Sequence, residues 1–385
     1  MRKLKLGIIG YGNMGSSHVG NIMAGKTPNT ELCALCDRDP ERRKVFKDRY
    51  PDIPVFENPE ELMDSGLCEA ILVAVPHYDH VPLAIMGFNK GLHVLVEKPA
   101  GVYTKQVREM NEVAKKSGKV FGLMFNQRTK PCYQKLREMI KRGDLGHIKR
   151  VTWIITNWYR CQAYHESSEW RSTWSGEGGG ALINQNPHQL DLWQWLFGMP
   201  DKIYARASFG KYRDIEVEDE VVALFEYDNG TIGQYITSTT EAPGTNRLEI
   251  SADMGKIVIE NNKMTFERNI MPEPEYNKIA KVFEAPEVWD CQVPMDFGSG
   301  EQHSGIIKNF ADAILSGKEL LAKGEEGIFG LTISNSMHYS AWTGETVDTK
   351  NFPDDKFYEL LMEKIEKSTF VKKVNKVIFD TTGSY

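Results

Sequence analysis

A glycine-rich turn near the N-terminus is the first feature of this chain that predicts chemistry. Residues 3–15 read Lys-Leu-Lys-Leu-Gly-Ile-Ile-Gly-Tyr-Gly-Asn-Met-Gly, so an apolar strand leads directly into a Gly-x-Gly-x-x-Gly turn. Gly10 permits the tight turn, Gly12 lets a pyrophosphate approach the backbone, and Gly15 lets the following helix pack on the strand. Asp37 ends the next apolar segment, 22 residues after Gly15, where an acid would bind ribose hydroxyls. Together they predict a dinucleotide site.

A lysine at the end of a later apolar segment could act on a substrate hydroxyl. Lys98 follows Val96-Glu97 and precedes Pro99, at the sheet edge where a nicotinamide should lie. It could donate a hydrogen bond to the hydroxyl oxygen, or act as a base if desolvation or a nearby cation lowers its pKa. A solvated lysine is the plain alternative, and the position at a strand end favours the catalytic interpretation.

A histidine follows a glycine-rich run, Gly178-Gly179-Gly180. Asn184, His188 and Asp191 share one face if a single helix runs through all three. Pro187 favours instead a helix that begins there, with His188 in its first turn. The positive end of the helix dipole would then favour neutral imidazole, the form that a general base requires. A structural histidine with satisfied hydrogen bonds is the alternative.

The segment 158–174 is rich in aromatic and basic side chains. Aromatic faces suit the apolar C–H face of a sugar ring, while hydroxyl and guanidinium groups can bind its hydroxyls. A packed loop with aromatic anchors is the alternative. The candidate substrate contacts are Tyr159, Arg160, Trp170 and Arg171, together with Asn184 and with His303, which precedes a later helix.

The elements that must position these residues divide the chain in two. Up to residue 125, apolar strands with little polar alternation are separated by helices, which predicts a doubly wound Rossmann domain, residues 1–125, with a parallel sheet and its ligand beyond the carboxyl ends of the strands. The expected strands are Leu4–Ile9, Glu31–Cys36, Glu69–Val75, His93–Val96 and Val120–Phe125.

After residue 125, strand-like runs follow one another with short turns such as 228–230 and 254–255. This pattern predicts an α+β domain, residues 126–385, with one large open and mostly antiparallel sheet. We expect this domain to bind substrate and to support oligomerisation, with its last helices packing back on the first domain. The expected strands are His147–Thr156, Lys202–Phe209, Glu220–Tyr227, Thr231–Thr239, Arg247–Ala252, Lys256–Glu260 and Met264–Glu267.

The composition excludes several classes of protein. The 47 basic and 53 acidic residues give a formal charge of −6, which argues against nucleic-acid binding. No apolar run approaches a membrane span, and the basic N-terminus leads straight into the first strand, so we expect a cytoplasmic protein without a signal peptide. Cys33 and Cys36 fall on opposite faces of a predicted strand, so we interpret them as core thiols and expect no metal site.

The order of the motifs resembles the Gfo/Idh/MocA oxidoreductases. These motifs are the glycine turn, Val-Pro-His-Tyr-Asp-His at residues 75–80, Gly-Leu-His-Val-Leu-Val-Glu-Lys-Pro at residues 91–99, and the glycine-rich segment that leads to His188-x-x-Asp191. The resemblance covers essentially the whole chain. It implies a Rossmann domain joined to an open-sheet domain, NAD(H) or NADP(H) as cofactor, and a sugar, inositol or related polyol as substrate. It also implies that Lys98 and His188 flank the reacting carbinol.

The same resemblance implies the residues that contact the cofactor. Asp37 repels a 2′-phosphate and favours NAD, whereas the adjacent Arg38 would accommodate one, so NADP is the alternative. The implied cofactor contacts are Gly10, Tyr11, Gly12, Asn13, Met14, Asp37, Arg38, Pro76, His77, His80, Glu97, Lys98 and Asn126.

One position departs from the family pattern. Many family dehydrogenases carry an aspartate four residues before the histidine, and this chain has Asn184 there. An amide can orient a neighbour but cannot stabilise an imidazolium as a carboxylate does. The sequence therefore leaves open whether Lys98 or His188 is the base. The sequence of residues 183–195 resembles that of a subgroup that includes glucoside 3-dehydrogenases.

We therefore expect an NAD-dependent oxidoreductase that transfers a hydride between a secondary hydroxyl of a pyranoside or cyclitol and nicotinamide. One alternative is an NAD-dependent glycoside hydrolase of the family 109 kind, which uses transient oxidation and elimination. The other is a non-catalytic NAD-binding regulator, against which the presence of both Lys98 and His188 argues. The resemblance implies a homo-oligomer, a dimer or tetramer, and we expect no nucleic-acid or membrane partner.

Overall fold

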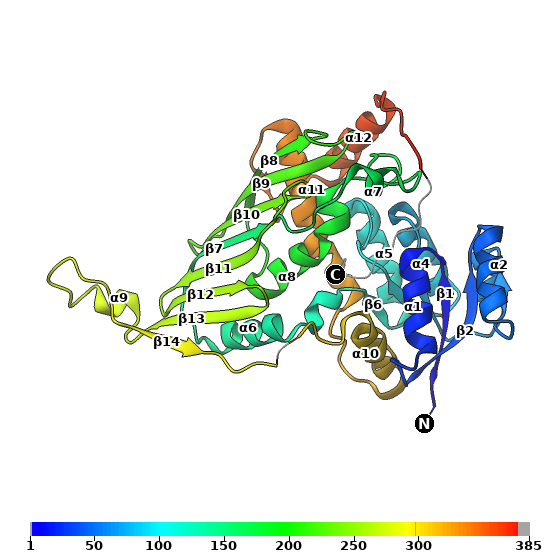
Figure 1. Cartoon of the computed structure of the whole chain (residues 1–385), viewed down its shortest axis with the longest axis horizontal. Coiled ribbons are helices and arrows are strands. Elements are labelled where there is room, and N and C mark those ends of the chain that lie inside the picture. The colour runs from blue at the N-terminus through cyan, green and yellow to red at the C-terminus, as the bar shows by residue number, and fades with distance from the viewer. Residues whose placement is uncertain (1, 297, 376–385) are drawn as a thin grey trace.

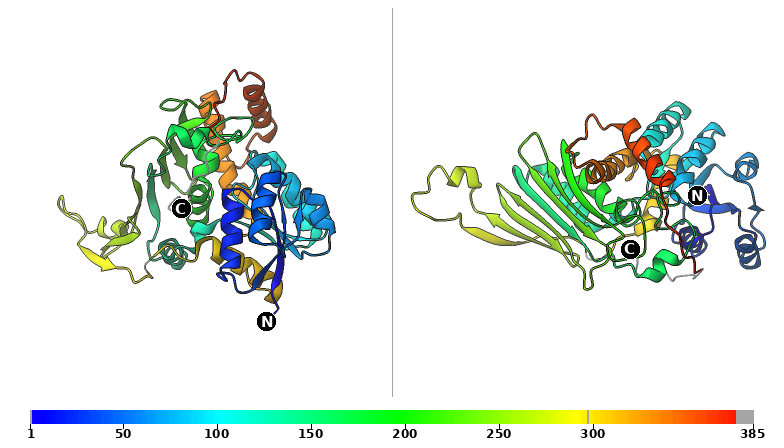
Figure 2. Two further views of the ribbon diagram at one scale, coloured as in Figure 1. Left: turned by 45° about the vertical axis from the view of Figure 1, so that its right-hand side comes forward. Right: turned by 90° about the horizontal axis from the view of Figure 1, so that it is seen from above.

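Two β-sheets organise the chain (Figure 1). The computed structural model describes residues 2–296 and 298–375, so the last ten residues of the expected second domain lie outside the described residues. The first sheet has six strands and the second has nine. Figure 2 shows the second sheet as a broad curved layer beside the helices that separate it from the first.

The N-terminal sheet is parallel throughout, in the order β3-β2-β1-β4-β5-β6. The five predicted strands are confirmed, and the sequence reading missed only the short β3 in this sheet. The strands are β1 Leu4–Ile9, β2 Thr30–Cys36, β3 Val55–Phe56, β4 Ala70–Val73, β5 His93–Val96 and β6 Phe121–Leu123. The helices between them are α1 Asn13–Met23, α2 Pro40–Arg49, α3 Pro59–Asp64, α4 His80–Asn89 and α5 Thr104–Ser117.

The second sheet follows the order β14-β13-β12-β11-β7-β10-β9-β8-β15. All its pairs are antiparallel except β7 with β10. The turn at 228–230 joins β9 to β10, and the turn at 254–255 joins β11 to β12, as predicted. The strands are β7 Ile148–Ile155, β8 Lys202–Phe209, β9 Glu218–Glu226, β10 Ile232–Ser238, β11 Asn246–Ala252, β12 Gly255–Glu260, β13 Lys263–Asn269, β14 Val288–Gln292 and β15 Val347–Asp348.

Helices cover one face of this second sheet (Figures 1 and 2). They are α6 Pro131–Arg142, α8 Pro187–Phe197 and α11 Gly327–Thr343. Trp193 of α8 packs on Phe225 of β9 with ring centroids 4.8 Å apart, inside a core that also holds Trp153 and Tyr235. Along β9 the side chains alternate, so Val222 and Leu224 on the opposite face are exposed.

The late helices reach back to the first sheet. Phe310 of α10 (Gln302–Ser316) lies in the core of the N-terminal sheet, where Gly122 of β6 leaves room for its ring. Asp354 and Asp355 at the start of α12 (Asp354–Glu366) form ion pairs with side chains of α5. Two short helices, α7 Gln162–Glu166 and α9 Glu273–Tyr276, complete the described elements.

The cysteines of the Cys-x-x-Cys pair do not meet. Cys33 Sγ lies 2.8 Å from Cys68 Sγ, whereas Cys36 Sγ lies 3.5 Å from the carbonyl oxygen of Glu57. Among the described residues there is no group of three or more His, Cys, Asp or Glu side chains placed to hold a metal. None of the described helices is long and apolar enough to cross a membrane.

Candidate active site

The three glycines of the N-terminal turn have different surroundings. Gly10 has φ +98°, and a Cβ there would lie 2.3 Å from the carbonyl oxygen of Ala74. A Cβ on Gly15 would lie 1.8 Å from the carbonyl oxygen of Gly10. A Cβ on Gly12 would meet only Arg42 Nη1, at 3.6 Å. Gly10 and Gly15 are therefore required by the packing of the chain itself, whereas Gly12 borders open space at the start of α1.

Asp37 ties the glycine turn to the end of β2. Its Oδ2 accepts a hydrogen bond from the backbone N–H of Tyr11 at 2.6 Å, and its Oδ1 accepts one from Asp39 at 2.8 Å. Arg42 Nη1 of α2 lies 3.7 Å from Asp37 Oδ2. The side chain of Arg38 is exposed and makes no hydrogen bond or ion pair with the described residues. Arg42 is thus the cation nearest to this carboxylate.

Glu97 connects the end of β5 to helix α1. Its Oε1 lies 2.6 Å from His18 Nε2, and its Oε2 accepts a hydrogen bond from the backbone N–H of Lys98 at 3.1 Å. Burial raises the pKa of Glu97, but the hydrogen bond to His18 and the charges of His18, His303 and Lys98 outweigh burial and lower the pKa to about 2. The carboxylate is therefore ionised directly behind Lys98.

Lys98 points toward the glycine-rich segment of the second half of the chain. Its Nζ donates to the carbonyl oxygen of Asn184 at 2.8 Å and lies 3.4 Å from Asn184 Oδ1. Burial lowers the pKa of Lys98 to about 8, helped by Arg171 and Arg160 and opposed by Glu97 and Glu177. A pKa this close to neutrality lets the amine exchange a proton under physiological conditions.

Asn184 does not lie on the same helix as His188. Residues Ala181–Gln185 form a short π-helical turn, which ends at Asn186 before α8 begins with Pro187. The expectation of a continuous helix through Asn184 is therefore wrong, because Pro187 has no N–H to extend the turn. The alternative expectation, a helix that begins at Pro187 with His188 in its first turn, is confirmed.

A buried carboxylate lies next to Asn184. Glu177 Oε1 accepts a hydrogen bond from Asn184 Nδ2, and its Oε2 accepts one from the backbone N–H of Ser172 at 2.5 Å. Burial raises the pKa of Glu177, while Arg171 and both hydrogen bonds act against burial. The position at which the family resemblance implies an aspartate therefore holds an amide, and this amide contacts a carboxylate seven residues earlier in the chain.

His188 is buried with its Nδ1 lacking a hydrogen-bond partner among the described residues. Burial lowers the pKa of His188 well below its ordinary value, and the charge of Lys98 adds to this effect. The imidazole is therefore neutral at physiological pH. Lys98 and His303 both help to lower the pKa of His188, although the three residues come from the loop after β5, from α10 and from α8.

Other residues predicted at the site link its two halves. The ring nitrogens of His80 lie 2.7 and 2.8 Å from the carbonyl oxygens of Pro99 and Val75, so His80 holds two strand-end loops together. His77 Nδ1 lies 3.0 Å from the carbonyl oxygen of Glu177, and its ring meets that of Trp170 at 5.1 Å. These contacts join the first sheet to the segment predicted to bind substrate.

The residues predicted to contact substrate gather around Tyr164. The guanidinium groups of Arg160 and Arg171 lie over its ring at 4.9 and 4.5 Å, and its hydroxyl accepts a hydrogen bond from Arg171 at 2.6 Å. The same hydroxyl lies 3.3 Å from Asn184 Nδ2. Tyr159, by contrast, is about half exposed and lies under Arg213. Tyr164 therefore connects the two arginines to the amide that holds Lys98.

Asp191, the last residue of the His-x-x-Asp motif, is fully engaged elsewhere. Both its oxygens accept hydrogen bonds from Arg128, at 2.8 and 2.5 Å, and both side chains are 1% exposed. Burial lowers the pKa of Arg128, but Asp191 and Glu326 outweigh burial and raise it, so the guanidinium stays charged. Asp191 therefore anchors α8 beneath His188.

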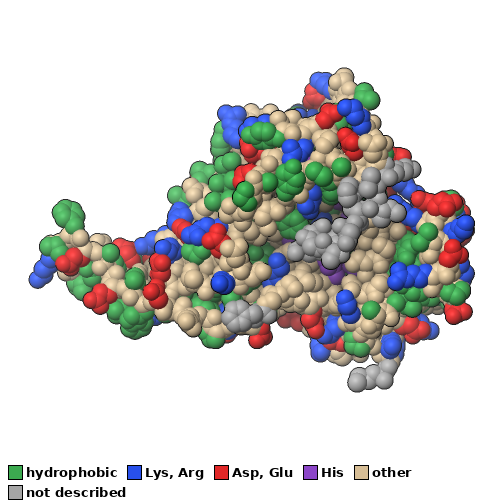
Figure 3. All heavy atoms as spheres, viewed as in Figure 1, with side chains coloured by type: hydrophobic (Ala, Val, Ile, Leu, Met, Phe, Trp, Pro, Cys, Tyr) green, Lys and Arg blue, Asp and Glu red, His purple; other side chains and the backbone are tan. Residues whose placement is uncertain are grey.

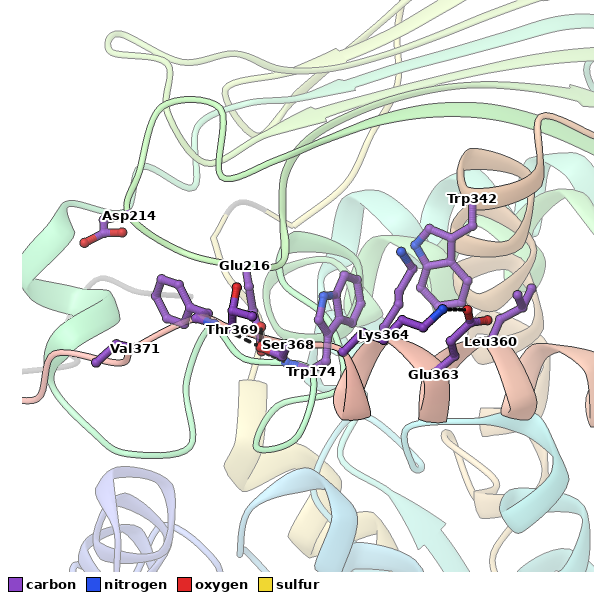
Figure 4. A pocket seen from close by; sticks show the side chains of 12 residues that line it. Trp174, Asp214, Glu216, Trp342, Leu360, Glu363, Lys364, Ser368, Thr369 and Val371 are labelled. Carbon is purple, nitrogen blue, oxygen red and sulfur yellow. Dashed lines mark hydrogen bonds and ion pairs between the residues drawn. The ribbon is translucent and has the colours of Figure 1, made fainter.

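A cavity next to this region is lined by Trp174 and by residues of the C-terminal helices (Figure 4). It has a volume of about 800 Å³ and is bordered by α11, α12 and residues 367–371. Lys364 lies over the rings of Trp174, Phe209 and Trp342 at its wall. Neither Lys98 nor His188 lines it, so this cavity is separate from the candidate site.

The residues at the first sheet fit a dinucleotide. The N-terminus of α1 carries no acidic residue in its first turn and no side-chain cap, which leaves its N–H groups available to a pyrophosphate. Asn126, at the end of β6, donates to Gln302 at 2.7 Å but leaves its buried Oδ1 without a partner among the described residues. Such an orphaned oxygen is typical of a ligand contact.

Three contacts at the site were missed from the sequence. They come from Glu177, His18 and Arg42. Glu177 immediately precedes the glycine run, and His18 follows the glycine turn by one turn of helix. Their positions next to these motifs were the only sequence feature that could have identified them as site residues. Nothing in the spacing connects either residue to its partner.

Two family models match the chain. The oxidoreductase family model for the NAD-binding Rossmann fold of GFO/IDH/MocA proteins matches residues 4–125, and the GFO/IDH/MocA C-terminal domain matches residues 133–258. Together these matches cover well over half of the chain.

Individual relatives are more distant. The uncharacterized oxidoreductase YdgJ of Escherichia coli is 30% identical over 51% of this chain, which spans 54% of that protein. The D-glucoside 3-dehydrogenase of Escherichia coli is 28% identical over 60% of this chain and 68% of its own length. The WlbA dehydrogenase of Bordetella pertussis, solved in complex with NADH and UDP-GlcNAcA, shares the fold with a TM-score of 0.76 at 24% identity, covering 90% of this chain and 99% of that one.

Proposed function

The chain belongs to the GFO/IDH/MocA family of NAD-binding oxidoreductases, and we propose that it oxidises a secondary hydroxyl of a pyranoside or cyclitol with NAD as the hydride acceptor. The observation that carries this proposal is the hydrogen bond of 2.8 Å from Lys98 Nζ, at the carboxyl end of the first sheet, to the carbonyl oxygen of Asn184, four residues before His188. This bond brings Lys98 to the segment that leads into α8, where the charge of Lys98 helps to lower the pKa of His188. The similarity to D-glucoside 3-dehydrogenase supports the choice of a sugar substrate.

We assign cofactor binding to residues 1–125 and substrate binding mainly to residues 126–385. The turn from Gly10 to Gly15 would hold the pyrophosphate and Asp37 the ribose. When bound, NAD supplies the nicotinamide ring that accepts the hydride. Asp37 favours NAD over NADP because its carboxylate would repel a 2′-phosphate, and Arg42 is the cation that NADP would use instead.

Gly12→Ala should weaken NAD binding about tenfold or more without unfolding the protein. The added methyl group meets no protein atom closer than 3.6 Å, and Gly12 has an ordinary φ of −77°, so the methyl would interfere only with a pyrophosphate on the backbone. Fluorescence titration with NADH and thermal melting of the unliganded protein measure the two effects. Gly20→Ala, in the same helix with nothing within 4 Å, is the control and should leave NADH affinity unchanged while raising the melting temperature slightly, because alanine favours a helix over glycine. Unchanged NADH affinity in Gly12→Ala would contradict the assignment.

Lys98 is the better candidate for the base. A neutral lysine amine can donate its two hydrogens to the oxygens of Asn184 and still present its lone pair to a hydroxyl proton. His188 is neutral, and its partnerless Nδ1 is best left unprotonated, because a buried N–H without an acceptor is the costlier state. The Nε2–H of His188 would then donate a hydrogen bond to the oxygen as its negative charge develops.

Glu177→Gln should move the acidic limb of the pH profile of kcat/KM to lower pH, by on the order of one unit. The oxidation needs unprotonated Lys98, so its rate should rise with pH until the pKa of Lys98, about 8, is passed. The Glu177 anion raises that pKa, and its removal therefore lowers it. Glu166→Gln, which removes a carboxylate on nearby α7, should leave the limb in place. An acidic limb that stays in place or moves to higher pH in Glu177→Gln would contradict the role of Glu177 in raising the pKa of Lys98.

A screen for NAD reduction across pyranosides, cyclitols and sugar acids, with NADP in parallel, tests the proposed function. Stoichiometric NADH with one oxidised carbon, located by NMR, is the expected result. Release of an aglycone without net NADH would identify the glycoside hydrolase reaction instead. Tight NAD binding with no turnover of any compound would contradict the enzymatic proposal.

We also propose that the chain forms a homo-oligomer through the open face of the second sheet. Val222, Leu224 and Ile232 are exposed there, and such apolar patches mark interaction surfaces. An arm between β13 and β14 carries further exposed side chains, Ile279 and Phe283, and Figure 3 shows hydrophobic side chains at its tip. Light scattering should give a molar mass that is a multiple of the 43.8 kDa of one chain. The double variant Val222→Lys with Leu224→Lys should have a lower molar mass. A monomeric wild-type protein would contradict this.

A further inference from the structure

Within residues 2–296 and 298–375, two arginines beside the candidate base have no carboxylate partner. Among the residues that the structure describes, no carboxylate oxygen lies within 4 Å of the guanidinium nitrogens of Arg160 or Arg171. Arg160 Nη1 donates to the carbonyl oxygen of Tyr159 at 3.0 Å, and its buried Nε has no partner in the same part of the chain. Arg171 Nη1 donates to the Tyr164 hydroxyl. Each guanidinium, with its five N–H donors, therefore has one hydrogen-bond acceptor among the described residues.

The chain satisfies a buried arginine fully where the role is structural. Arg128 donates to Asp191, to Glu326 at 2.5 Å and to the carbonyl oxygen of Leu321 at 3.0 Å. Glu177, the buried carboxylate nearest to Arg171, is already engaged by Asn184 and by the backbone of Ser172. Arg160 and Arg171 are instead partly exposed, and their described acceptors are one carbonyl and one hydroxyl oxygen, so both guanidinium groups can still bind an anion.

The positive charge is concentrated around the substrate segment. Burial lowers the pKa of His165 to about 3, and four cations add to the effect, which are Lys372, Arg213, Arg171 and Arg160. Two of them, Arg171 and Arg160, also lower the pKa of Lys98. The positive charge of this cluster therefore reaches the candidate base, Lys98, as well as His165. The Lys372 Nζ donates to the carbonyl oxygens of His165 and Arg171 and forms no ion pair with the described carboxylates.

Resting on the proposed oxidoreductase function, we propose that the substrate is a sugar that bears an oxyanion, a carboxylate or a phosphate, and that Arg160 and Arg171 bind this group. A neutral polyol would leave the two guanidinium charges to be balanced only by Glu177 and by solvent. A planar guanidinium instead matches the oxygens of a carboxylate or phosphate with two parallel hydrogen bonds. Tyr164 lies between this anion site and the amide that binds Lys98. Both guanidinium groups pack over its ring, and its hydroxyl contacts Asn184.

The test compares matched sugars with the wild-type enzyme. The probes are methyl glucoside, methyl glucuronoside and glucose 6-phosphate, each with saturating NAD. The preference for one of the charged sugars over methyl glucoside in kcat/KM should be tenfold to a hundredfold, about the range of a hydrogen bond to a charged group. The favoured charged sugar distinguishes carboxylate from phosphate. Equal or better turnover of the neutral glucoside would overturn the proposal.

Variants separate anion binding from general damage to the site. Arg160→Gln and Arg171→Gln should each lower kcat/KM for the charged sugar about tenfold or more and change it for the neutral sugar by less than about threefold. Arg268→Gln is the control, because Arg268 also lies over an aromatic ring, Trp289 at 5.8 Å, but on the edge strands of the second sheet. Equal losses for both sugars in the arginine variants would overturn the proposal.

A binding measurement tests the anion site separately from the proposed dehydrogenase activity. Thermal melting of the NAD-loaded protein with glucuronate, glucose 6-phosphate or glucose needs no turnover. Stabilisation by a charged sugar that is lost in Arg171→Gln supports anion binding even if no sugar is oxidised, in which case the dehydrogenase proposal alone fails. Stabilisation by glucose equal to that by both charged sugars overturns the anion site.

Discussion

Lys98→Met is expected to lower kcat for alcohol oxidation about a thousandfold while leaving NADH affinity within about threefold. The amine is the group whose lowered pKa, about 8, matches proton transfer near neutral pH, and general base catalysis contributes on the order of a hundredfold to ten-thousandfold. Methionine preserves most of the side-chain volume, so the change removes the amine rather than the packing.

The side chain contacts Asn184 across the two halves of the chain, and its loss leaves the glycine turn untouched. Steady-state kinetics and NADH titration on the same preparation separate the two effects. Lys105→Met, which removes an exposed lysine paired with Asp355, is the control and should retain full activity. Wild-type kcat in Lys98→Met would exclude Lys98 as the base and leave His188 as the candidate.

Asp191→Ala is expected to destabilise the protein by about 3–5 kcal/mol, the cost of leaving a buried charge without its partner. Arg128 would keep Glu326 but lose both hydrogen bonds to Asp191 in a region where both side chains are 1% exposed. Because α8 begins with Pro187 and carries His188 in its first turn, the change should also reduce activity by loosening that turn.

Chemical denaturation followed by tryptophan fluorescence measures this loss. Asp355→Ala, which breaks the exposed pair with Lys105, should cost at most about 1 kcal/mol. Replacing both partners, as Arg128→Met with Asp191→Leu, should recover part of the stability, because the uncompensated charge is gone. A wild-type midpoint in Asp191→Ala would show that the pair contributes little and that Asp191 has another role.

Most regular elements could be predicted because their signals are local. The strands β1, β5 and β8 were predicted with the bounds that they have, since apolar runs and turn residues lie within a few positions of each other. Pro187 likewise placed His188 in the first turn of a helix. The strands that were not predicted, β3, β14 and β15, have weak patterns, and the short helices α3, α7 and α9 were not predicted either. Val288 and Trp289 of β14 are exposed and flank charged residues, so no buried face produces an alternation there.

The candidate site could be predicted in its parts but not in its connections. Lys98 was selected by its place after a strand, and Arg160 and Arg171 by their aromatic neighbours. The bond from Lys98 to Asn184 joins residues 86 positions apart, and the ion pair from Arg128 to Asp191 joins residues 63 apart. No local pattern encodes such pairs, because they exist only once two sheets have packed around shared helices.

By itself, the sequence determined the dinucleotide turn, the parallel and open sheets and the residue types available for catalysis, because backbone preferences and hydrophobic periodicity act over short distances. The tertiary structure decided what those residues do. It pairs Asp191 with Arg128, places Glu177 within hydrogen-bond distance of Asn184, and buries Lys98 so that the pKa of Lys98 falls to about 8. Burial and charge are properties of the packed surroundings, and the surroundings of each of these side chains come from distant parts of the chain.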